Sequence, residues 1–433
     1  MGIKARKILL FFVDFLLLYL SLFLTLFLRY FKNFNLEIFS KHLLPFSILY
    51  FFWLLIFYIF GFYDLSPKKI SFLLRVFSAF SIVLFLSISF FYFLPVFGIA
   101  PKTNLLLNLT VFGILFLFWR FSFYSLFSSY FLNKIAILGT GKEVEELKKE
   151  ILKNPNLGYK LLTIDPQKPL KEQIQTKEID TIVFTPEFEG NPDFLNSLYQ
   201  CLPLGVNFLD LASAFEEIEE KIPVSKISKI WFLENLKEGQ KRVYDKLKRI
   251  FDIVFSLLIL ILTSPIWPLI ALAIKIENGG PVFYLQERVG KNKKIFKLIK
   301  FRSMIKEAEK EGPKWAEIED KRVTKVGKFL RRFHLDEIPQ MINVLKGDIS
   351  LVGPRPERPE FVEKLEKEIP YYHLRHIIKP GFTGWAQIKF RYARSIEDSL
   401  EKFQYDLYYI KNRNFFLDLR ILLKTFQLFF KKE

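Results

Sequence analysis

Four apolar runs occupy the first third of the chain. They cover roughly 8–28, 43–62, 72–94 and 105–127, with short polar stretches between them. A helix of about 20 apolar residues crosses a bilayer, because each residue adds about 1.5 Å along the axis. The pattern therefore predicts four transmembrane helices within residues 1–131.

Cations flank these runs unevenly. Because Lys and Arg collect on the cytoplasmic side of membrane helices, the charges place the N-terminus and the exit of the fourth run in the cytoplasm, and the short connection near Pro101 outside. The cations are Lys4, Arg6, Lys7, Lys68, Lys69, Arg75, Arg120 and Lys134. Asp14 lies inside the first run. A carboxylate within a membrane can have a functional role. The alternative is that it snorkels to the surface or packs against another helix.

Residues 132–240 change to an alternating strand and helix pattern. Apolar strands are expected at 134–138, 159–164, 181–184 and 206–211, with helices at 143–152 and 191–201. This alternation predicts a small parallel sheet of Rossmann-like type. Gly139 and Gly141 follow the first strand, but the third glycine of the dinucleotide fingerprint is missing, which favours a structural or regulatory role over nucleotide binding. The charged stretch 216–229 is expected to be peripheral.

A fifth apolar run, about 249–275, is interrupted by Ser264, Pro265 and Pro268. An interior proline removes a backbone hydrogen bond and bends a helix. Cations lie on both sides of this run, so both ends favour the cytoplasm. We therefore expect a re-entrant helix that breaks at Ser264-Pro265 and returns to the same side; a Pro-kinked crossing is the alternative.

The last segment, 415–433, alternates apolar clusters with charged residues. It predicts an amphipathic helix on the membrane surface, with a core helix of the last domain as the alternative.

Composition agrees with a membrane protein. The 433 residues include 51 Phe, aromatic residues make up 17% and the formal net charge is +18; the mean hydropathy is +0.20. Together with the apolar runs, the positive charge favours an anionic membrane leaflet or a phosphorylated substrate over nucleic acid. Cys201 is the single cysteine, which excludes an intramolecular disulfide and a Cys-based zinc site.

Two adjacent carboxylates, Asp336 and Glu337, follow a basic run at 328–332. About twenty residues later the chain carries Arg355 between two prolines. Acidic side chains beside fixed cations suit a metal ion and a phosphate ester. The alternative is that Asp336 only caps a helix whose first turn contains Glu337 and Pro339.

Residues from about 241 to 432 resemble the bacterial sugar transferase family, the monotopic polyprenyl-phosphate phosphoglycosyl transferases. The four N-terminal runs and the degenerate Rossmann-like region resemble the long members, which initiate exopolysaccharide or O-antigen synthesis. The resemblance rests on ordered motifs, namely Gly280-Pro281-Val282-Phe283-Tyr284, Gln286-Glu287-Arg288-Val289-Gly290, Lys300-Phe301-Arg302-Ser303-Met304, Arg331 to Gln340, Gly347 to Pro356, Lys379-Pro380-Gly381-Phe382-Thr383-Gly384-Trp385-Ala386-Gln387 and Tyr405-Asp406-Leu407-Tyr408-Tyr409.

The resemblance implies a reaction at a bacterial inner membrane, with the soluble domains facing the cytoplasm. A sugar-1-phosphate passes from a UDP-sugar to polyprenyl (undecaprenyl) phosphate, and UMP is released. Asp336 would be the nucleophile that forms a phosphosugar-enzyme intermediate, and Glu337 would hold Mg²⁺. The first half resembles the family in architecture only.

The same resemblance assigns supporting residues. Lys300, Arg302, Arg331 and Arg355 would bind substrate phosphates or nucleotide, and Asp406 would support the site. Generic surface charge or contact with lipid head groups is the alternative for the cations. Ser264 and Pro265 match the family's helix-breaking pair. The expected fold is thus a four-helix membrane bundle, a Rossmann-like α/β domain at 132–240, and an α-rich catalytic domain at 241–433.

Other functions are weaker. A membrane-anchored nucleotide-sugar dehydratase or epimerase needs the full glycine set, which is incomplete here, and a Tyr-x-x-x-Lys pair. Tyr244 and Lys248 have that spacing, but they lie directly before a membrane segment and not in an α/β core. A polysaccharide-export scaffold with an inactive transferase domain would not need Asp336 and Glu337. A transporter needs more polar residues within the membrane. A homodimer through the helices is possible, and the sugar is open.

Overall fold

The computed structural model describes residues 2–65, 72–93, 102–129, 132–165, 168–188, 191–227, 229–306, 308, 322–390 and 395–429. The chain divides into two compact units, the first ending at Ile218 and the second beginning at Glu219. Lys68, Lys69 and Pro101, which entered the orientation argument, lie outside the described residues.

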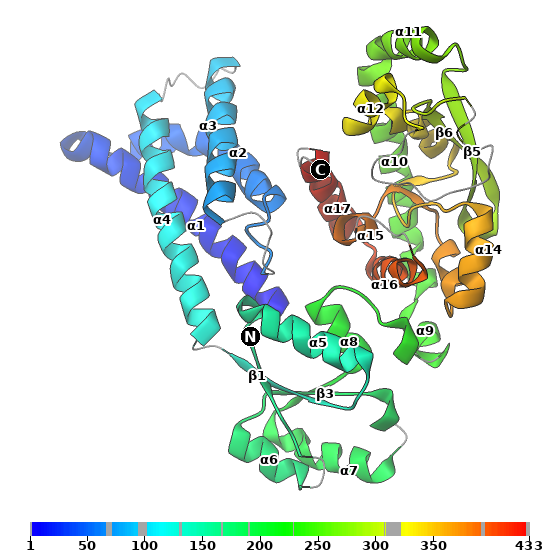
Figure 1. Ribbon diagram of the computed structural model, residues 1–433. Coiled ribbons are helices and arrows are strands. Elements are labelled where there is room, and N and C mark those ends of the chain that lie inside the picture. The colour runs from blue at the N-terminus through cyan, green and yellow to red at the C-terminus, as the bar shows by residue number, and fades with distance from the viewer. Residues whose placement is uncertain are drawn as a thin grey trace. The chain divides into compact units, whose positions relative to one another are not determined.

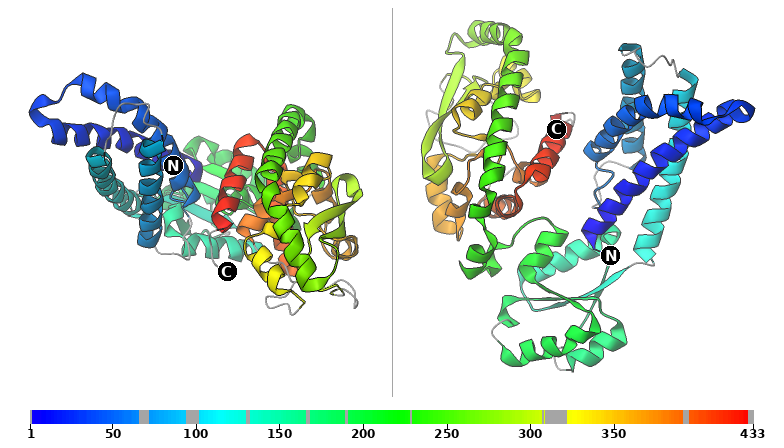
Figure 2. Two further views of the ribbon diagram at one scale, coloured as in Figure 1. Left: turned by 90° about the horizontal axis from the view of Figure 1, so that it is seen from above. Right: turned by 180° about the vertical axis from the view of Figure 1, so that it is seen from behind.

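Helices cover the four N-terminal apolar runs (Figure 1). Together with the segment Lys229–Asn278, they are five helices in the described residues that are long and apolar enough to cross a membrane. Figure 2 shows α1 (blue) packed beside α4 (cyan). Their bounds are Ile3–Tyr30 for α1, Leu36–Ile59 for α2, Phe72–Phe93 for α3 and Lys102–Ser129 for α4.

Polar side chains inside these helices are paired with one another. Asp14 of α1 and Arg120 of α4 form an ion pair with both side chains fully buried. Tyr50 donates to the Asn108 side chain at 3.0 Å, and Asn108 donates to Ser21 at 3.0 Å, which joins α2, α4 and α1. Packing against another helix, one of the readings left open for Asp14, is therefore what the structure shows.

The α/β part of the first unit contains a four-stranded parallel sheet in the order β2-β1-β3-β4. The predicted parallel sheet is confirmed, and each strand lies within or one residue outside its predicted range. The bounds are β1 Asn133–Leu138, α5 Lys142–Lys153, β2 Tyr159–Leu162, α6 Leu170–Lys177, β3 Thr181–Phe184, α7 Pro192–Cys201, β4 Asn207–Asp210 and α8 Leu211–Ile218.

One apolar core joins the membrane helices to this sheet. Ile3 and Leu10 of α1 belong to the same buried cluster as Val144 of α5 and Phe215 of α8. In addition, Arg6 donates to the carbonyl of Gly158, just before β2, at 3.2 Å. The α/β domain and the helices therefore pack as one body.

Helices α6 and α8 were not predicted. In α8 the buried residues Leu211, Phe215 and Ile218 recur at helical spacing, a signal that the following acidic residues obscured. The charged stretch after it is also not wholly peripheral. Lys221 is buried against Glu219, and Glu220 is buried against Arg420. Side-chain ion pairs between distant segments made this burial possible.

The second unit is α-rich, as predicted, with two small pairs of strands. Strands β5 and β6 are antiparallel, and β7 and β8 are parallel. The bounds are α9 Lys229–Asn235, α10 Arg242–Thr263, α11 Trp267–Asn278, β5 Phe283–Val289, β6 Ile295–Phe301, α12 Lys325–Arg332, α13 Gln340–Lys346, β7 Ser350–Val352, α14 Pro359–Glu368, β8 Gly381–Thr383, α15 Trp385–Lys389, α16 Ile396–Asn412 and α17 Phe415–Phe429.

The fifth apolar run is broken where the sequence predicts. A single 3₁₀ turn, Ser264–Ile266, separates α10 from α11, and α11 turns away from the line of α10 in Figure 1. Both helices pack on this unit. Asp252 of α10 accepts hydrogen bonds from Ser350 and the Leu351 amide, and Ile270 of α11 lies in a buried cluster with Phe301 and Leu330.

Helix α17 has one buried and one exposed face. Asp418 accepts hydrogen bonds from Tyr244 and Tyr409, and Ile421 is fully buried, as expected for a core helix. Phe415 and Phe416 remain exposed. The predicted amphipathic character is present in α17, and its contact with a membrane stays a prediction.

The Asp14–Arg120 pair should stabilise the helix bundle. We expect Asp14→Leu to leave Arg120 charged and buried without its partner, at a cost of about 3–5 kcal/mol in the free energy of unfolding. The double variant Asp14→Leu/Arg120→Met should recover most of this loss, because two packed apolar side chains replace two buried charges. Thermal unfolding in detergent measures both.

The control is Glu37→Gln, which breaks the exposed Glu37–Lys41 pair and should hardly change the melting temperature. A single Asp14→Leu variant as stable as the wild type would show that the buried pair does not hold α1 and α4 together.

Candidate active site

Four separate segments of the second unit supply the charged residues of the candidate site. Lys300 comes from β6, Arg331 from the last turn of α12, and the carboxylates from the 3₁₀ turn Leu335–Glu337. Arg355 follows β7 in the segment Gly353–Pro356. The sequence placed these residues in order along the chain, and the fold brings most of them together.

The chain between α12 and the carboxylates turns sharply. His334 adopts the left-handed conformation, with φ of 53°. Gly327 lies in α12 against the end of β6, where an added Cβ would approach the Ser303 carbonyl oxygen to 1.9 Å. Since no side chain fits there, α12 packs directly on the backbone that follows Lys300.

Glu337 is the common partner of two cations. Its Oε1 accepts a hydrogen bond from Lys300 Nζ at 2.8 Å and one from Arg355 Nη2 at 2.5 Å. Burial by itself would raise the pKa of Glu337, but the charges of Arg355 and Lys300 outweigh it and hold the pKa well below its usual range. Glu337 is therefore a carboxylate at every physiological pH.

The pKa of the Lys300 ammonium is lowered, although an ion pair with a carboxylate usually raises the pKa of a lysine. Burial lowers it, and the nearby charge of Arg355 adds to this, although Glu337 opposes both. The explanation is that Lys300 shares one carboxylate with Arg355, so its charge is only partly compensated. Both ion pairs of Glu337 are formed, since the contact distances are 2.8 Å to Lys300 and 2.5 Å to Arg355.

Asp336 lies beside this cluster in a different environment. It is 6% exposed, and among the described residues no group donates a hydrogen bond to its carboxylate. Burial raises its pKa, the negative charge of Glu337 raises it further, and the charges of Lys300 and Arg331 only partly oppose this. Two adjacent carboxyl groups thus have pKa values shifted in opposite directions.

The helix-cap reading of Asp336 is wrong. Helix α13 begins at Gln340 after Pro339, and the Asp336 side chain caps neither it nor the preceding turn. Asp336 and Glu337 lie in a 3₁₀ turn, Leu335–Glu337. With three residues per turn, their side chains diverge by about 120°, which lets them face different partners.

The other predicted residues lie at varying distances from this centre. Arg331 donates to the Ser303 hydroxyl at 2.9 Å and contributes positive charge at Asp336. Arg302 is not joined to the carboxylates; its guanidinium lies near Gly280. Ser264 and Pro265 lie at the break between α10 and α11, where the Ser264 hydroxyl donates to the Ile261 carbonyl.

Asp406 supports the site through a residue that the sequence argument missed. Arg375 donates to the Asp406 carboxylate at 2.9 Å, to the backbone carbonyl of Arg355 at 2.9 Å and to the Tyr372 hydroxyl at 2.7 Å. Arg375 and Asp406 are 3% and 1% exposed. Through Arg375, this buried pair holds the backbone carbonyl of Arg355. In the sequence, Arg375 was only one more arginine just before the motif that begins at Lys379.

A second support holds the other end of the Pro-Arg-Pro segment. Arg288 of β5 donates to the Pro356 carbonyl at 3.0 Å, and the Val289 amide donates to the Glu357 carbonyl at 2.9 Å. Lys402 of α16 pairs with the Glu357 side chain at 2.9 Å. Arg355 is thus positioned by contacts on both sides of it.

A magnesium ion is compatible with these side chains. The described residues contain no group of three or more His, Cys, Asp or Glu that could hold a metal. Mg²⁺, however, commonly takes one or two carboxylates and completes its shell with substrate phosphates and water. Glu337 Oε1 is occupied by Lys300 and Arg355, while Oε2 accepts no hydrogen bond from the part of the chain that the structure describes.

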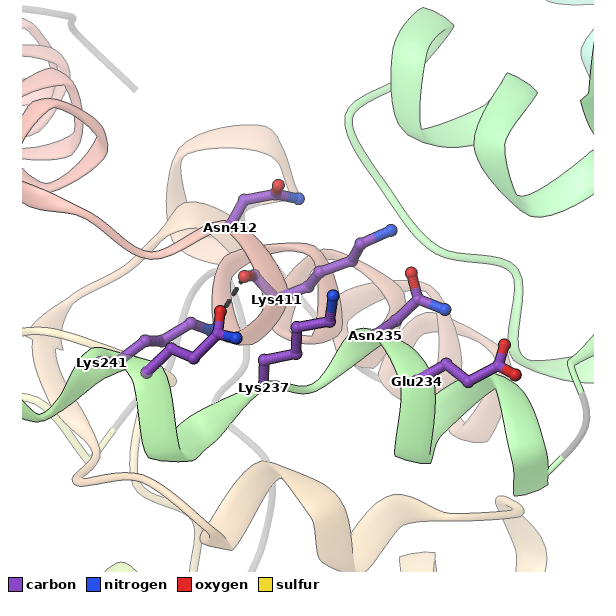
Figure 3. A pocket seen from close by; sticks show the side chains of 7 residues that line it. Glu234, Asn235, Lys237, Lys241, Lys411 and Asn412 are labelled. Carbon is purple, nitrogen blue, oxygen red and sulfur yellow. Dashed lines mark hydrogen bonds between the residues drawn. The ribbon is translucent and has the colours of Figure 1, made fainter.

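A surface pocket elsewhere in the unit is not part of this site (Figure 3). Its Lys241 donates to the carbonyls of Ile410 and Lys411 at the end of α16. A cation in that place satisfies the carbonyls at a helix C-terminus and is structural. The lining residues are Glu234, Asn235, Lys237, Gln240, Lys241, Lys411 and Asn412.

Comparison with known proteins identifies this unit. The family model described as bacterial sugar transferase matches residues 243–432. A protein of Bacillus subtilis (strain 168), named uncharacterized sugar transferase EpsL, is 43% identical over 183 residues, covering 41% of this chain and 85% of that protein. The chain belongs to the bacterial sugar transferase family.

Two longer relatives carry more specific names. The UDP-N-acetylgalactosamine-undecaprenyl-phosphate N-acetylgalactosaminephosphotransferase of Aeromonas hydrophila is 46% identical over 183 residues, 42% of this chain and 43% of that protein. The undecaprenyl-phosphate glucose phosphotransferase of Komagataeibacter xylinus is 31% identical over 310 residues, 68% of this chain and 58% of that protein. The chain therefore spans less than two thirds of either relative.

The residues that suggested a dehydratase or epimerase have another role in this family member. Tyr244 and Lys248 both contact Asp418 of α17, and Lys248 also donates to Tyr409. They fasten α10 to α16 and α17, within the second unit. The Tyr-x-x-x-Lys spacing is thus a structural coincidence.

The opposite pKa shifts lead to a prediction about stability. We expect Asp336→Asn to melt at a higher temperature than the wild type at pH 7. A carboxyl group with a raised folded-state pKa costs stability increasingly as the pH rises from its unfolded-state pKa to the folded-state pKa and fully above that, and the variant removes this cost. The difference should vanish below about pH 3.9, the ordinary Asp pKa, where both side chains are neutral. Thermal unfolding across pH measures it.

Glu337→Gln is the matched control and should behave in the opposite way. Its lowered folded-state pKa stabilises the protein above about pH 4.3, and this contribution is lost as the pH falls. The variant should melt lower at pH 7. An Asp336→Asn variant that is less stable than the wild type at pH 7 would contradict the raised pKa.

Proposed function

We propose that this protein transfers a sugar-1-phosphate from a UDP-sugar to a polyprenyl phosphate, namely undecaprenyl phosphate, and releases UMP. The observation that carries the proposal is the buried Asp336 carboxylate, without a hydrogen-bond donor among the described residues, next to Glu337 with its two cations. The names of the relatives support the two substrate classes.

In the first step, an oxygen of the Asp336 carboxylate attacks the β-phosphorus of the UDP-sugar. The bond from that phosphorus to the bridging oxygen breaks, and UMP leaves with the electron pair. In the second step, an oxygen of polyprenyl phosphate attacks the same phosphorus and releases the Asp336 carboxylate. Dividing the transfer in this way lets a soluble and a lipid substrate use one site in turn.

The surrounding charges suit this chemistry. A carboxylate that accepts no hydrogen bond keeps its lone pairs for attack, and burial makes its charge more costly before reaction than after it. Lys300 and Arg355 would bind diphosphate oxygens, Arg355 with the fork geometry that phosphate groups favour. Arg331 would compensate negative charge beside Asp336. Arg302, turned toward Gly280, would act at the edge of the site.

Glu337 would hold Mg²⁺ through Oε2, with substrate phosphate oxygens and water as further ligands. When bound, the ion would neutralise diphosphate charge and favour departure of UMP. Glu337 itself keeps Lys300 and Arg355 in place through Oε1. The Arg375–Asp406 pair holds the Arg355 backbone, so Asp406 acts through Arg355 and not on substrate.

We further propose that α1 to α4 cross the bacterial inner membrane with the soluble parts in the cytoplasm, and that α10 and α11 form a re-entrant element. Support for re-entry comes from the packing of α10 and α11 on one unit, through Asp252 and Ile270 respectively. Leu262, Leu269 and Leu272, on either side of the break, are exposed and apolar. Such a protein would catalyse the first membrane step of exopolysaccharide, O-antigen or capsule synthesis.

The transfer can be tested directly. Membranes that contain the protein are incubated with polyprenyl phosphate, Mg²⁺ and each of a panel of UDP-sugars, and lipid-linked sugar phosphate and UMP are measured. We expect one UDP-sugar class to give both products in equal amounts. Asp336→Asn should reduce the rate at least about a thousand-fold, the usual loss when a catalytic nucleophile is removed.

The melting temperature of Asp336→Asn provides the folding control. Wild-type turnover by that variant would exclude Asp336 as the nucleophile. Glu337→Gln should need more Mg²⁺ for half-maximal rate, and an unchanged requirement would argue against Glu337 as a ligand.

Re-entry is tested by labelling single cysteines on the two sides of the break. In a Cys201→Ser background, Lys246→Cys and Asn292→Cys place thiols at exposed positions before α10 enters its apolar part and after β5. A membrane-impermeant thiol reagent should label both from the cytoplasmic side of sealed vesicles. Labelling from opposite sides would establish a crossing helix instead.

A further inference from the structure

Helix α12, which ends four residues before Asp336, exposes a face of mixed aromatic and cationic side chains. Phe329 and Phe333 lie one turn apart, are 57% and 49% exposed, and have ring centroids 5.0 Å apart. Lys325, Lys328 and Arg332 lie on the same exposed face. Large exposed aromatic side chains are unusual on a protein surface that meets only water.

The direction of this face is set by the packing of the other side of α12. Leu330 is buried in a cluster with Ile270 and Ile274 of α11. The carboxylate of Glu277, at the end of α11, accepts hydrogen bonds from the Lys325 amide at 2.7 Å and the Val326 amide at 3.0 Å. Helix α12 therefore cannot rotate to bury its phenylalanines without losing these contacts.

The neighbouring helix α11 is itself apolar on its exposed side. Leu269, Leu272 and Ile276 are 67%, 58% and 77% exposed. Figure 1 shows α12 beside α11 at the same end of this unit. An apolar surface on one helix thus adjoins a surface on the next helix in which phenylalanines alternate with cations.

The charges of α12 identify what this face would meet. Within the described residues, Lys328 and Arg332 form no ion pair. A helix whose aromatic side chains alternate with unpaired cations suits the interface of a bilayer, where rings enter the acyl boundary and cations meet anionic head groups. An acidic protein partner would satisfy the cations but leave the continuity with α11 unexplained.

We propose that the exposed face of α12 binds anionic lipid head groups at the membrane surface, with Phe329 and Phe333 inserted below them. Because His334 turns the chain directly into the carboxylate pair, this contact would hold Asp336 at the level where a lipid phosphate meets water. The lipid contact stands on the geometry of α12 alone; only its consequence for Asp336 rests on the proposed function.

The contact can be measured without catalysis. The full-length protein with Cys201→Ser and Phe329→Cys is labelled with an environment-sensitive fluorophore and reconstituted into vesicles of phosphatidylcholine alone or with phosphatidylglycerol. We expect quenching by spin-labelled lipids to be several-fold stronger in the anionic vesicles. Lys328→Gln/Arg332→Gln should reduce it toward the value in phosphatidylcholine.

Matched controls come from α14, which Figure 1 places at the other end of this unit from α11. Lys364→Gln/Lys367→Gln removes two exposed charges there and should leave quenching at position 329 unchanged. A fluorophore at Lys364→Cys should stay accessible to water. These variants separate a local effect of α12 from the effect of net charge.

Three results would overturn the proposal. They are a fluorophore at 329 as accessible to water as the one at 364, equal quenching in both kinds of vesicle, and protection from water in vesicles without quenching by spin-labelled lipids, which would point to a protein partner. Adding Asp336→Asn should leave the quenching unchanged. An inactive wild-type protein that still shows anionic-lipid quenching would contradict the proposed function and not the lipid contact.

Discussion

The compensation of the buried Glu337 carboxylate is the constraint on which the site depends. A charge taken out of water is tolerated only when opposite charges and hydrogen bonds surround it. Lys300 and Arg355 meet this need at 2.8 Å and 2.5 Å from one carboxylate oxygen. They come from β6 and from the segment after β7, so the ion pairs bring together parts of the chain that are far apart in sequence. Within the part of the chain that the structure describes, no group donates a hydrogen bond to Asp336, and the charges of Lys300 and Arg331 only partly offset its burial, so the two neighbouring carboxyl groups lie in contrasting environments.

The residues behind the site show how this geometry is maintained. Arg355 is held at its backbone by Arg375, which is in turn paired with Asp406 in α16. On the other side, Gly327 lets α12 touch the backbone next to Lys300. Lys300 and Arg355 are therefore each positioned by a different buried contact. Rigid support of this kind matters because small displacements of charged groups weaken their action on a reacting phosphate.

The apolar helices also carry buried charges that are compensated by partners. In the first unit, Asp14 and Arg120 neutralise each other between α1 and α4, where water is not available to do so. In the second unit, α10 and α11 keep exposed apolar faces, while their other faces pack on the unit that carries Asp336 and Glu337. A site built on such helices is suited to a lipid substrate whose phosphate lies at the surface and whose chain stays in the bilayer.

The sequence by itself determined the elements and the candidate chemistry. Apolar run length predicted helices α1 to α4, the alternation after residue 132 predicted the parallel sheet, and Ser264-Pro265 predicted the break before α11, because these signals are local. It also placed Asp336, Glu337, Lys300 and Arg355 in one candidate site. Only the tertiary structure decided that Glu337 holds both cations, that Arg302 turns away, that Arg375 links Asp406 to Arg355, and that Lys221 is buried. These outcomes depend on which distant side chains meet, and no periodicity along one segment records that.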